Sequence, residues 1–145
     1  MLRIAAIAVA VFALALADAR AAAAPPMPVD DAAAKREATE AGTAWLALVD
    51  AKKYAESWDQ ASSLFRKKIS RDQWVSMIGG ARGGVGKLQG RKFASASYTS
   101  LDGVPTVVLA WDSSFGAASG LTEQVTMMLD DGRWRCGGYF IRPGG

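Results

Sequence analysis

Beyond residue 30, apolar positions recur at the spacing of an amphipathic helix. From Ala34 to Val49 they fall mostly three or four residues apart, which places them on one helical face with Trp45 and Leu48 as its anchors. Asp31 stands where a carboxylate suits the positive end of a helix dipole. We therefore expect a first helix that begins near Asp31 and packs through this face.

Two further helices are predicted next. The first is marked by apolar residues at steps of four, three and four, namely Tyr54, Trp58, Ala61 and Phe65. The second begins at Ser70, which has the Ser-x-x-Gln spacing of a capping box with Gln73. It should stop near Gly79–Gly84, because each glycine inside a helix costs about 1 kcal/mol relative to alanine.

From Phe93 onward the apolar period becomes alternating, which is typical of strands. The expected strands cover residues 93–100, 105–115, 121–129 and 133–141, and Asp-Asp-Gly at 130–132 is a tight-turn signal. Alternation places six residues on one inner face: Leu109, Trp111, Val125, Met127, Trp134 and Phe140. The order of elements predicts an α+β fold, with three N-terminal helices packed on one face of a curved, four-stranded antiparallel meander sheet in a cone-like arrangement.

The start of the chain has a different pattern, that of a secretory signal peptide. A short basic start, Met1–Arg3, is followed by Ile4–Leu16, an unbroken apolar run of 13 residues. This run is shorter than the ~20 residues that a membrane-spanning helix needs. Small residues at suitable spacing place cleavage near Ala19–Ala24. We expect a signal peptide over 1–23, a proline-rich leader over 24–30, a single domain over 31–142, and a periplasmic or secreted protein without stable membrane insertion.

Composition narrows the possible chemistry. The chain has no histidine and a single cysteine, Cys136, which excludes Ser-His-Asp and Cys-His catalysis, the common zinc sites and an internal disulfide. We therefore expect no metal and no cofactor. The formal net charge of +3 is too small to indicate a nucleic-acid partner, and the sequence has no base-stacking motif.

The glycine-rich stretch from Gly79 to Lys92 lacks the spacing of a nucleotide-binding loop. A phosphate loop needs Gly-x-x-x-x-Gly-Lys-Ser/Thr, whereas Ala81 stands at the first glycine of that pattern and Leu88 at the hydroxyl position. The region is also basic, because Arg66–Lys92 contains eight basic residues and the single acid Asp72. This basic segment is either a solvated surface or a patch that meets an acidic partner.

One carboxylate has the strand parity of an interior residue. Glu123 shares a face with Val125 and Met127, which makes it a weak candidate for a general acid, with Tyr98 as a side chain that could approach it. Its position near the end of a strand favours a solvated rim instead. We expect no catalytic residue, and the alternative is a histidine-free enzyme of the isomerase or dehydratase type that uses Glu123 and a tyrosine.

The five tryptophans fall one to an element. They either fill the core or line a pocket for an apolar ligand, in which case Trp58, Trp111 and Trp134 are the expected binding residues. Cys136 shares the face of Trp134 and is expected to be a small buried residue. Tyr139 would then lie on the outer face of the sheet, where it could support a homodimer together with Ile141.

The segments "WLALVD", "YAESW" and "GRWRCGGYFIR" resemble the exported bacterial family known as domain of unknown function 4019. The resemblance extends from about Glu40 to Arg142 and departs at Cys136, where the family more often has valine, and near 101–105. The order of elements is in turn similar to the cone-shaped fold of nuclear transport factor 2. The resemblance implies this fold but neither an activity nor catalytic residues, because folds of this kind serve enzymes and plain binding domains alike.

The sequence as a whole predicts an exported, non-enzymatic domain that binds a small apolar ligand or an envelope protein. One alternative is the histidine-free enzyme, and another is a pure protein-interaction module that uses the basic segment Arg66–Lys92. An apolar cavity would favour a ligand-binding domain or an enzyme, whereas a filled core would favour the interaction module.

Overall fold

The computed structural model describes residues 30–145, so the predicted signal peptide and all but the last residue of the predicted leader lie outside the described residues. Four helices precede four strands: α1 (Asp31–Asp50), α2 (Tyr54–Asp59), α3 (Ser63–Lys68), α4 (Arg71–Val85), β1 (Leu88–Leu101), β2 (Val104–Phe115), β3 (Leu121–Asp130) and β4 (Arg133–Pro143). The strands form one antiparallel sheet in the order β1-β2-β3-β4. The predicted α+β class and four-stranded meander are confirmed, and the second predicted helix is divided into α2 and α3.

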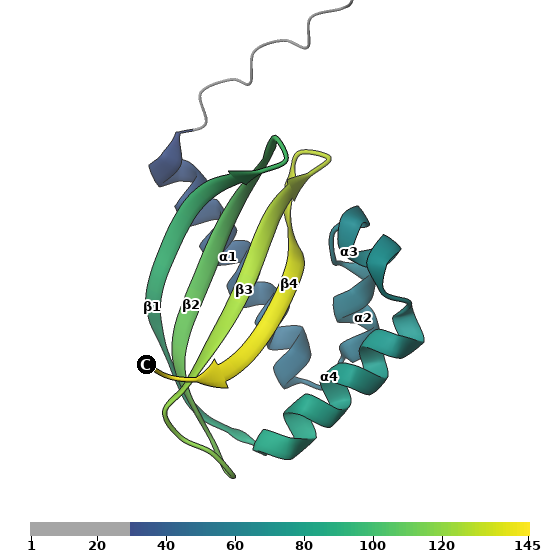
Figure 1. Cartoon of the computed structure of the whole chain (residues 1–145), viewed down its shortest axis with the longest axis vertical. Helices are drawn as coiled ribbons and strands as arrows, with labels where there is room; N and C mark the ends of the chain where they lie inside the picture. The colour runs from purple at the N-terminus through teal and green to yellow at the C-terminus, as the bar shows by residue number, and fades with distance from the viewer. Residues whose placement is uncertain (1–29) are drawn as a thin grey trace, which may run out of the picture.

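The sheet curves over one side of α1, as the predicted cone-like arrangement requires (Figure 1). Helix α1 contacts all four strands, and α2 packs on α4 beside the β4 edge of the sheet. The chain leaves α4 and returns to the opposite edge of the sheet as β1 (Figure 1). None of the helices within residues 30–145 is long and apolar enough to span a membrane.

The buried face of α1 is rotated slightly from the predicted one. Trp45 is an anchor, as expected, but Leu46 is the buried leucine, at 1% exposed, whereas Leu48 is only partly buried. Gly42 lies where the helix comes closest to β2, and a Cβ atom there would stand 2.5 Å from Cδ1 of Leu109. The absence of a side chain at this position therefore allows α1 to lie directly on the sheet.

Helix α4 begins at the predicted cap and includes the glycines near which it was expected to end. The Ser70 side chain accepts a hydrogen bond from the Gln73 amide at 3.2 Å, and the Gln73 side chain accepts one from the Ser70 amide at 3.0 Å. The helix continues through all four glycines to Val85, so it ends next to Gly84, at the far end of the predicted range. Three buried side chains hold this helix against the domain: Trp74, Ile78 and Arg82. It ends at Gly86, which has a positive φ of 83°.

The inner face of the sheet follows the predicted alternation along β2 and β3 but not along β4. Trp111 and Met127 are buried, as predicted, together with their neighbours on the same face. A β-bulge shifts the register of β4, because Thr126 pairs with Gly138 while Met127 pairs with Cys136. One residue of β4 is thus unpaired, and all side chains beyond it change face.

This bulge overturns the predicted faces of three β4 residues. Phe140, expected on the inner face, is 60% exposed. Tyr139, expected on the outer face, packs against Trp45 in the core, with ring centroids 5.6 Å apart. Ile141 pairs with Glu123 and therefore also lies on the inner side. A homodimer stays a prediction, but Tyr139 cannot take part in it through the outer face.

Cys136 lies before the bulge and is fully buried, as predicted. Burial raises the pKa of its thiol to about 12, from the ordinary value of 9.0. The thiol therefore stays protonated at neutral pH and acts as a small packing group.

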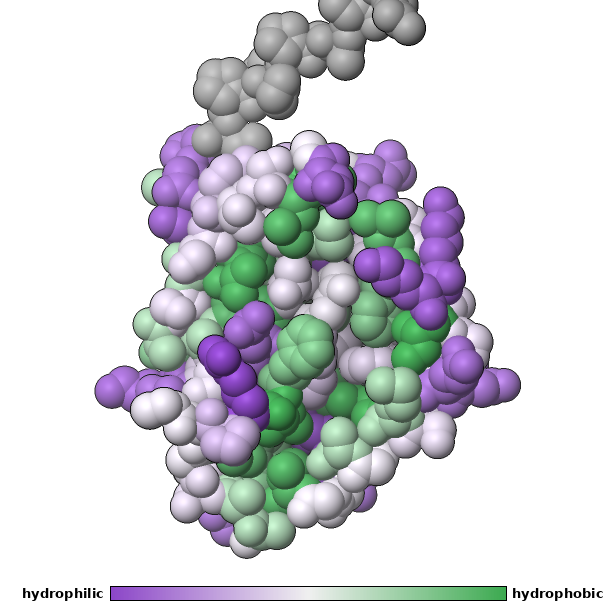
Figure 2. Space-filling model, viewed as in Figure 1, coloured by the Kyte–Doolittle hydropathy of each residue, from purple (hydrophilic) through white to green (hydrophobic). Residues whose placement is uncertain are grey.

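The outer surface of the sheet does not form one uniform apolar area. Figure 2 shows hydrophobic and polar residues mixed over the visible face, with hydrophobic residues gathered where the sheet meets the helices. Phe140 contributes an isolated exposed ring on this side. Scattered apolar side chains of this kind are normal on a protein surface and do not by themselves identify a binding face.

Candidate functional site

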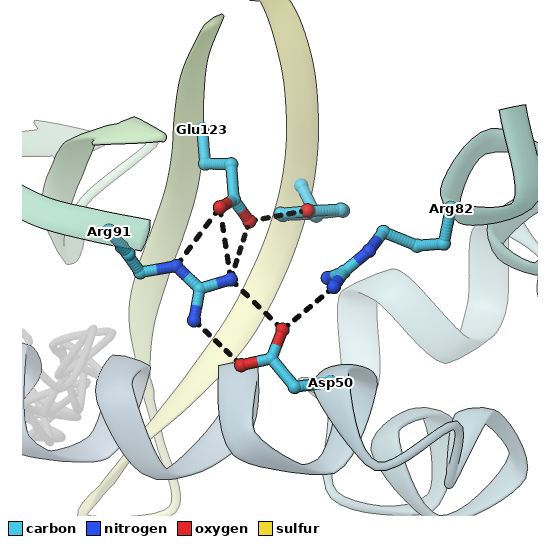
Figure 3. A network of polar contacts seen from close by, with 5 residues as sticks. Asp50, Arg82, Arg91 and Glu123 are labelled. Carbon is cyan, nitrogen blue, oxygen red and sulfur yellow. Dashed lines mark hydrogen bonds and ion pairs between the residues drawn. The ribbon is translucent and has the colours of Figure 1, made fainter. Parts of the chain in front are cut away.

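Five polar residues from five different elements meet inside the domain, at the end of α1 (Figure 3). Arg91 lies at the centre of this polar network. It donates two hydrogen bonds to the Asp50 carboxylate, at 2.7 and 3.0 Å, and two to the Glu123 carboxylate, at 2.9 and 3.0 Å. Arg82 donates to Asp50 at 2.8 Å, and the Tyr139 hydroxyl donates to Glu123 at 2.6 Å.

Each member is positioned by the element that carries it. Asp50 is the last residue of α1, and Arg82 lies one turn before the end of α4. Arg91 is on the inner face of β1, opposite Ser113. It is part of this strand because β1 begins at Leu88 rather than at the predicted Phe93. Tyr139 faces inward because of the β4 bulge.

Burial makes this network energetically important. The Glu123 side chain is completely buried, and the Arg91 side chain is 15% exposed. A buried charge is costly unless it is paired and hydrogen-bonded, and here two carboxylates face two guanidinium groups. The network is thus a neutral cluster of four charges that ties both helix ends to the sheet.

The protonation states follow from the contacts. Burial alone would raise the pKa of Asp50, but the hydrogen bonds from Arg91 and Arg82 outweigh burial and hold this pKa below its ordinary value of 3.8. Burial, followed by the neighbouring Glu123 carboxylate, raises the pKa of the Tyr139 hydroxyl far above its ordinary value. At neutral pH, Asp50 is therefore ionised and Tyr139 keeps its proton.

The predicted position of Glu123 at a solvated rim is wrong, because the residue is 0% exposed. Its inward strand parity is confirmed, and its tyrosine neighbour is Tyr139 rather than Tyr98. Both carboxylate oxygens accept hydrogen bonds, from Arg91 and from Tyr139. A carboxylate held in this way is poorly placed for proton transfer, since its acceptor sites face the protein itself.

A pocket of about 790 Å³ opens beside this network, between the ends of α1 and α4 and the start of β1. Its lining residues are Val49, Asp50, Lys52, Tyr54, Gly79, Arg82, Gly83, Gly86, Lys87 and Leu88. Asp50 and Arg82 are the members of the polar network that reach the pocket wall. Glu123 and Tyr139 do not belong to the part of the pocket lining that residues 30–145 provide.

One face of α4 forms a wall of the pocket and is almost without side chains. Gly79, Arg82, Gly83 and Gly86 follow one another at helical spacing, and all four line the pocket. Apart from its chain neighbours and the nearby backbone of α4 itself, a Cβ atom added at Gly83 would have no atom of residues 30–145 within 4 Å. Packing within the described domain therefore does not require glycine at position 83.

Arg82 is the exception on this face, and it is fixed in place. Its side chain is only 7% exposed, and its guanidinium group lies over the Phe115 ring, 4.9 Å from the centroid. Nη2 donates to Asp50, whereas Nη1 is buried and has no hydrogen-bond partner among residues 30–145. A buried donor without a partner is rare in folded proteins and marks a place where a further acceptor would be stabilising.

The three tryptophans predicted to bind a ligand lie elsewhere in the described domain. Trp58 donates to the Ile69 carbonyl at 2.9 Å, Trp111 is a core residue at 4% exposed, and Trp134 approaches Glu37 with 3.3 Å between Nε1 and Oε2. None of them is among the described residues that line the pocket. Each has a structural contact that accounts for its position.

The basic segment Arg66–Lys92 does not form one continuous charged patch. Arg71 is paired with Asp59, and Arg82 and Arg91 belong to the polar network. Arg66 lies 5.9 Å from the ring centroid of Trp58. Lys67 and Lys68 lie at the end of α3, and Lys87 and Lys92 lie near the start of β1, in a different part of the fold.

Sequence patterns did not identify Asp50, Arg82 or Arg91. The sequence does contain a signal for Arg91. If the first strand is extended back to Leu88, alternation puts Arg91 on the same face as Phe93, which pairs with Trp111. A second signal was the presence of Arg82 among glycines at helical spacing. Within residues 30–145, no group of three or more His, Cys, Asp or Glu side chains is arranged to hold a metal ion.

Comparison with known proteins identifies the family of the chain. The model of the family described as "Protein of unknown function (DUF4019)" matches residues 41–139, which include all five members of the polar network. No curated protein and no solved structure matches the chain, so the resemblance to nuclear transport factor 2 stays a prediction. The chain belongs to the family of proteins of unknown function DUF4019.

Proposed function

We propose that this domain binds a small organic molecule in the pocket between α1, α4 and β1, and that it does not catalyse a reaction. The volume of about 790 Å³ falls in the range of small-molecule sites, which is roughly 300–1,000 Å³. The lining combines apolar side chains, such as Val49, Tyr54 and Leu88, with a few polar groups, as ligand sites usually do.

The observation that carries this proposal is the glycine face of α4. Glycine within a helix is less stable than alanine by about 1 kcal/mol, so its use needs a reason. At Gly83, which lines the pocket, no atom of residues 30–145 beyond the chain neighbours and the nearby backbone of α4 lies within 4 Å of the position that a Cβ atom would take. Space kept open at this position is space for a ligand.

The observations give less support to the alternatives. An enzyme that used Glu123 would need this carboxylate at the pocket, yet Glu123 is buried behind Arg91 and bonded to it. An interaction module based on Arg66–Lys92 would need a continuous basic surface, and three of its arginines are paired with acidic residues. Export, predicted from residues 1–23, remains part of the proposal on sequence grounds alone.

Alanine substitutions on two sides of α4 provide the test. Gly83→Ala and Gly84→Ala should each stabilise the domain by about 0.5–1 kcal/mol, because both replace a helical glycine that has open space around it. Only Gly83→Ala places a methyl group in the pocket. We expect 1-anilinonaphthalene-8-sulfonate, an aromatic probe with one acidic group, to bind the native protein saturably and to bind Gly83→Ala more weakly.

Gly84→Ala is the matched control and should bind the probe like the wild-type protein. Fluorescence titration of the three proteins gives the affinities, and urea unfolding gives their stabilities. Probe affinity that is the same in all three proteins, or the absence of saturable binding to the wild type, would contradict the proposal.

A further inference from the structure

The pocket wall carries an excess of positive charge. The carboxylates of Asp50 and Glu123 balance the guanidinium groups of Arg82 and Arg91 within the polar network. Lys52 and Lys87 also line the pocket, and neither is among the members of the salt bridges found within residues 30–145. The side chains around the pocket thus leave two uncompensated positive charges.

Two helix ends oppose this excess in part. Helices α1 and α4 both finish beside the pocket, at Asp50 and Val85. The C-terminal end of a helix acts like about −0.5 of an elementary charge, so the two ends together contribute roughly −1. The side-chain charges and the two helix ends together leave a net charge of about +1 around the pocket, which suits a ligand with a single negative charge.

The partner for that negative charge is already in position. The Arg82 guanidinium is held by Asp50 on one side and by the Phe115 ring on the other, and its Nη1 has no acceptor among the described residues. Nη1 is buried, so a ligand oxygen reaches it only after a local shift of the pocket wall, but little side-chain freedom would be lost because the guanidinium group is ordered beforehand. A charge-assisted hydrogen bond of this kind is stronger than a neutral one.

The rest of the ligand should be apolar. Val49, Tyr54 and Leu88 supply apolar surface, and Gly79 and Gly83 leave room for the ligand to lie against the α4 backbone. A dianionic group is disfavoured, because the ionised Asp50 carboxylate is also part of the wall.

On the basis of the proposed function, we infer that the ligand is an amphipathic organic monoanion, a carboxylate on a short apolar chain or ring. Its acidic group lies at Arg82, with Lys52 and Lys87 at the mouth of the pocket. Its apolar part lies along the glycine face of α4.

Three probes with eight carbon atoms each test this inference: octanoate, octanamide and octyl phosphate. Isothermal titration calorimetry on the mature domain at neutral pH should show that octanoate binds about tenfold or more tightly than the neutral octanamide, because only octanoate forms a charge-assisted bond. Octyl phosphate, mainly dianionic at this pH, should bind more weakly than octanoate. Affinity for octanoate should also fall as salt is added, since Lys52 and Lys87 are exposed.

Two lysine variants locate the charge effect without disturbing the core. Lys87→Met should weaken octanoate binding by about two- to fivefold, the size expected of a partly screened charge pair. Lys92→Met is the matched control, because Lys92 is an exposed residue of β1, the strand that follows Lys87, and does not belong to the pocket lining; it should leave the affinity unchanged.

The outcomes separate this inference from the proposed function. Equal affinity for octanoate and octanamide would overturn the monoanion assignment while leaving a ligand pocket in place. Tighter binding of octyl phosphate than of octanoate would also overturn it. If neither the octyl probes nor 1-anilinonaphthalene-8-sulfonate bound, the proposed function would fail together with the inference.

Discussion

Replacing Arg91 with methionine should destabilise the domain by about 3–5 kcal/mol, because it leaves a buried carboxylate without its ionic partner. Glu123 is completely buried and would keep only the hydrogen bond from Tyr139. Asp50 would retain Arg82 and solvent, since its side chain is 25% exposed. Urea unfolding, followed by tryptophan fluorescence, measures this change in the free energy of unfolding.

Two further variants show whether the loss comes from the unpaired charge. Arg71→Met removes an ion pair of similar geometry with Asp59, in which both side chains are about half exposed, and it should change stability little. The double variant Arg91→Met with Glu123→Gln should be more stable than Arg91→Met alone, because the buried charge is then removed. If Arg91→Met cost no more than Arg71→Met, the network would not have the structural role assigned to it.

Trp45→Ala should also cost about 3–5 kcal/mol, because it removes a large side chain from the centre of the core. Trp45 is 3% exposed and lies against Trp74 and Tyr139, with ring centroids 6.0 and 5.6 Å away. Its indole also donates to the carbonyl of Ser57 at 2.9 Å, and the substitution leaves this buried acceptor unpaired. Equilibrium unfolding in urea, followed by circular dichroism, measures the loss.

Trp134→Ala is the comparison for this prediction. Trp134 is partly exposed, and its indole reaches only Glu37 at 3.3 Å. A half-buried side chain loses less apolar contact on truncation, so this variant should be clearly more stable than Trp45→Ala. The opposite order of stabilities would mean that the core is centred on β4 rather than on α1.

Local signals predicted most of the fold. The capping box at Ser70 and Gln73 located the start of α4, and the alternation of Leu109, Trp111 and Val125 located the inner face of the sheet. These features depend on residues that are neighbours in the chain, so the sequence shows them directly.

The faces of the last β4 side chains could not be predicted from such local signals. A bulge changes the face of every later side chain, and no residue in "RCGGYF" requires it, although glycine at 137 and 138 permits it. The pairing with β3, which is set by the whole sheet, determines where the extra residue lies. Alternation alone therefore predicts the wrong face for both Tyr139 and Phe140.

The polar network could not be predicted for a related reason. Asp50, Arg82, Arg91 and Glu123 come from four elements and are brought together only by tertiary packing. A buried carboxylate could be suspected at Glu123 from parity, but its ionic partner depends on where β1 begins and on the end of α1. The pocket follows from the same packing, since it lies between the ends of α1 and α4.

An NMR titration of the ¹⁵N-labelled domain with 1-anilinonaphthalene-8-sulfonate tests most directly whether the pocket binds a ligand. We expect saturable shifts at the amides of Gly79, Gly83 and Gly86, which line the pocket, and at the Arg82 side chain. Val108 and Thr126, which pair on the outer face of the sheet, should not shift. Shifts centred on that outer face, with the glycine amides of α4 unchanged, would contradict a ligand site in this pocket.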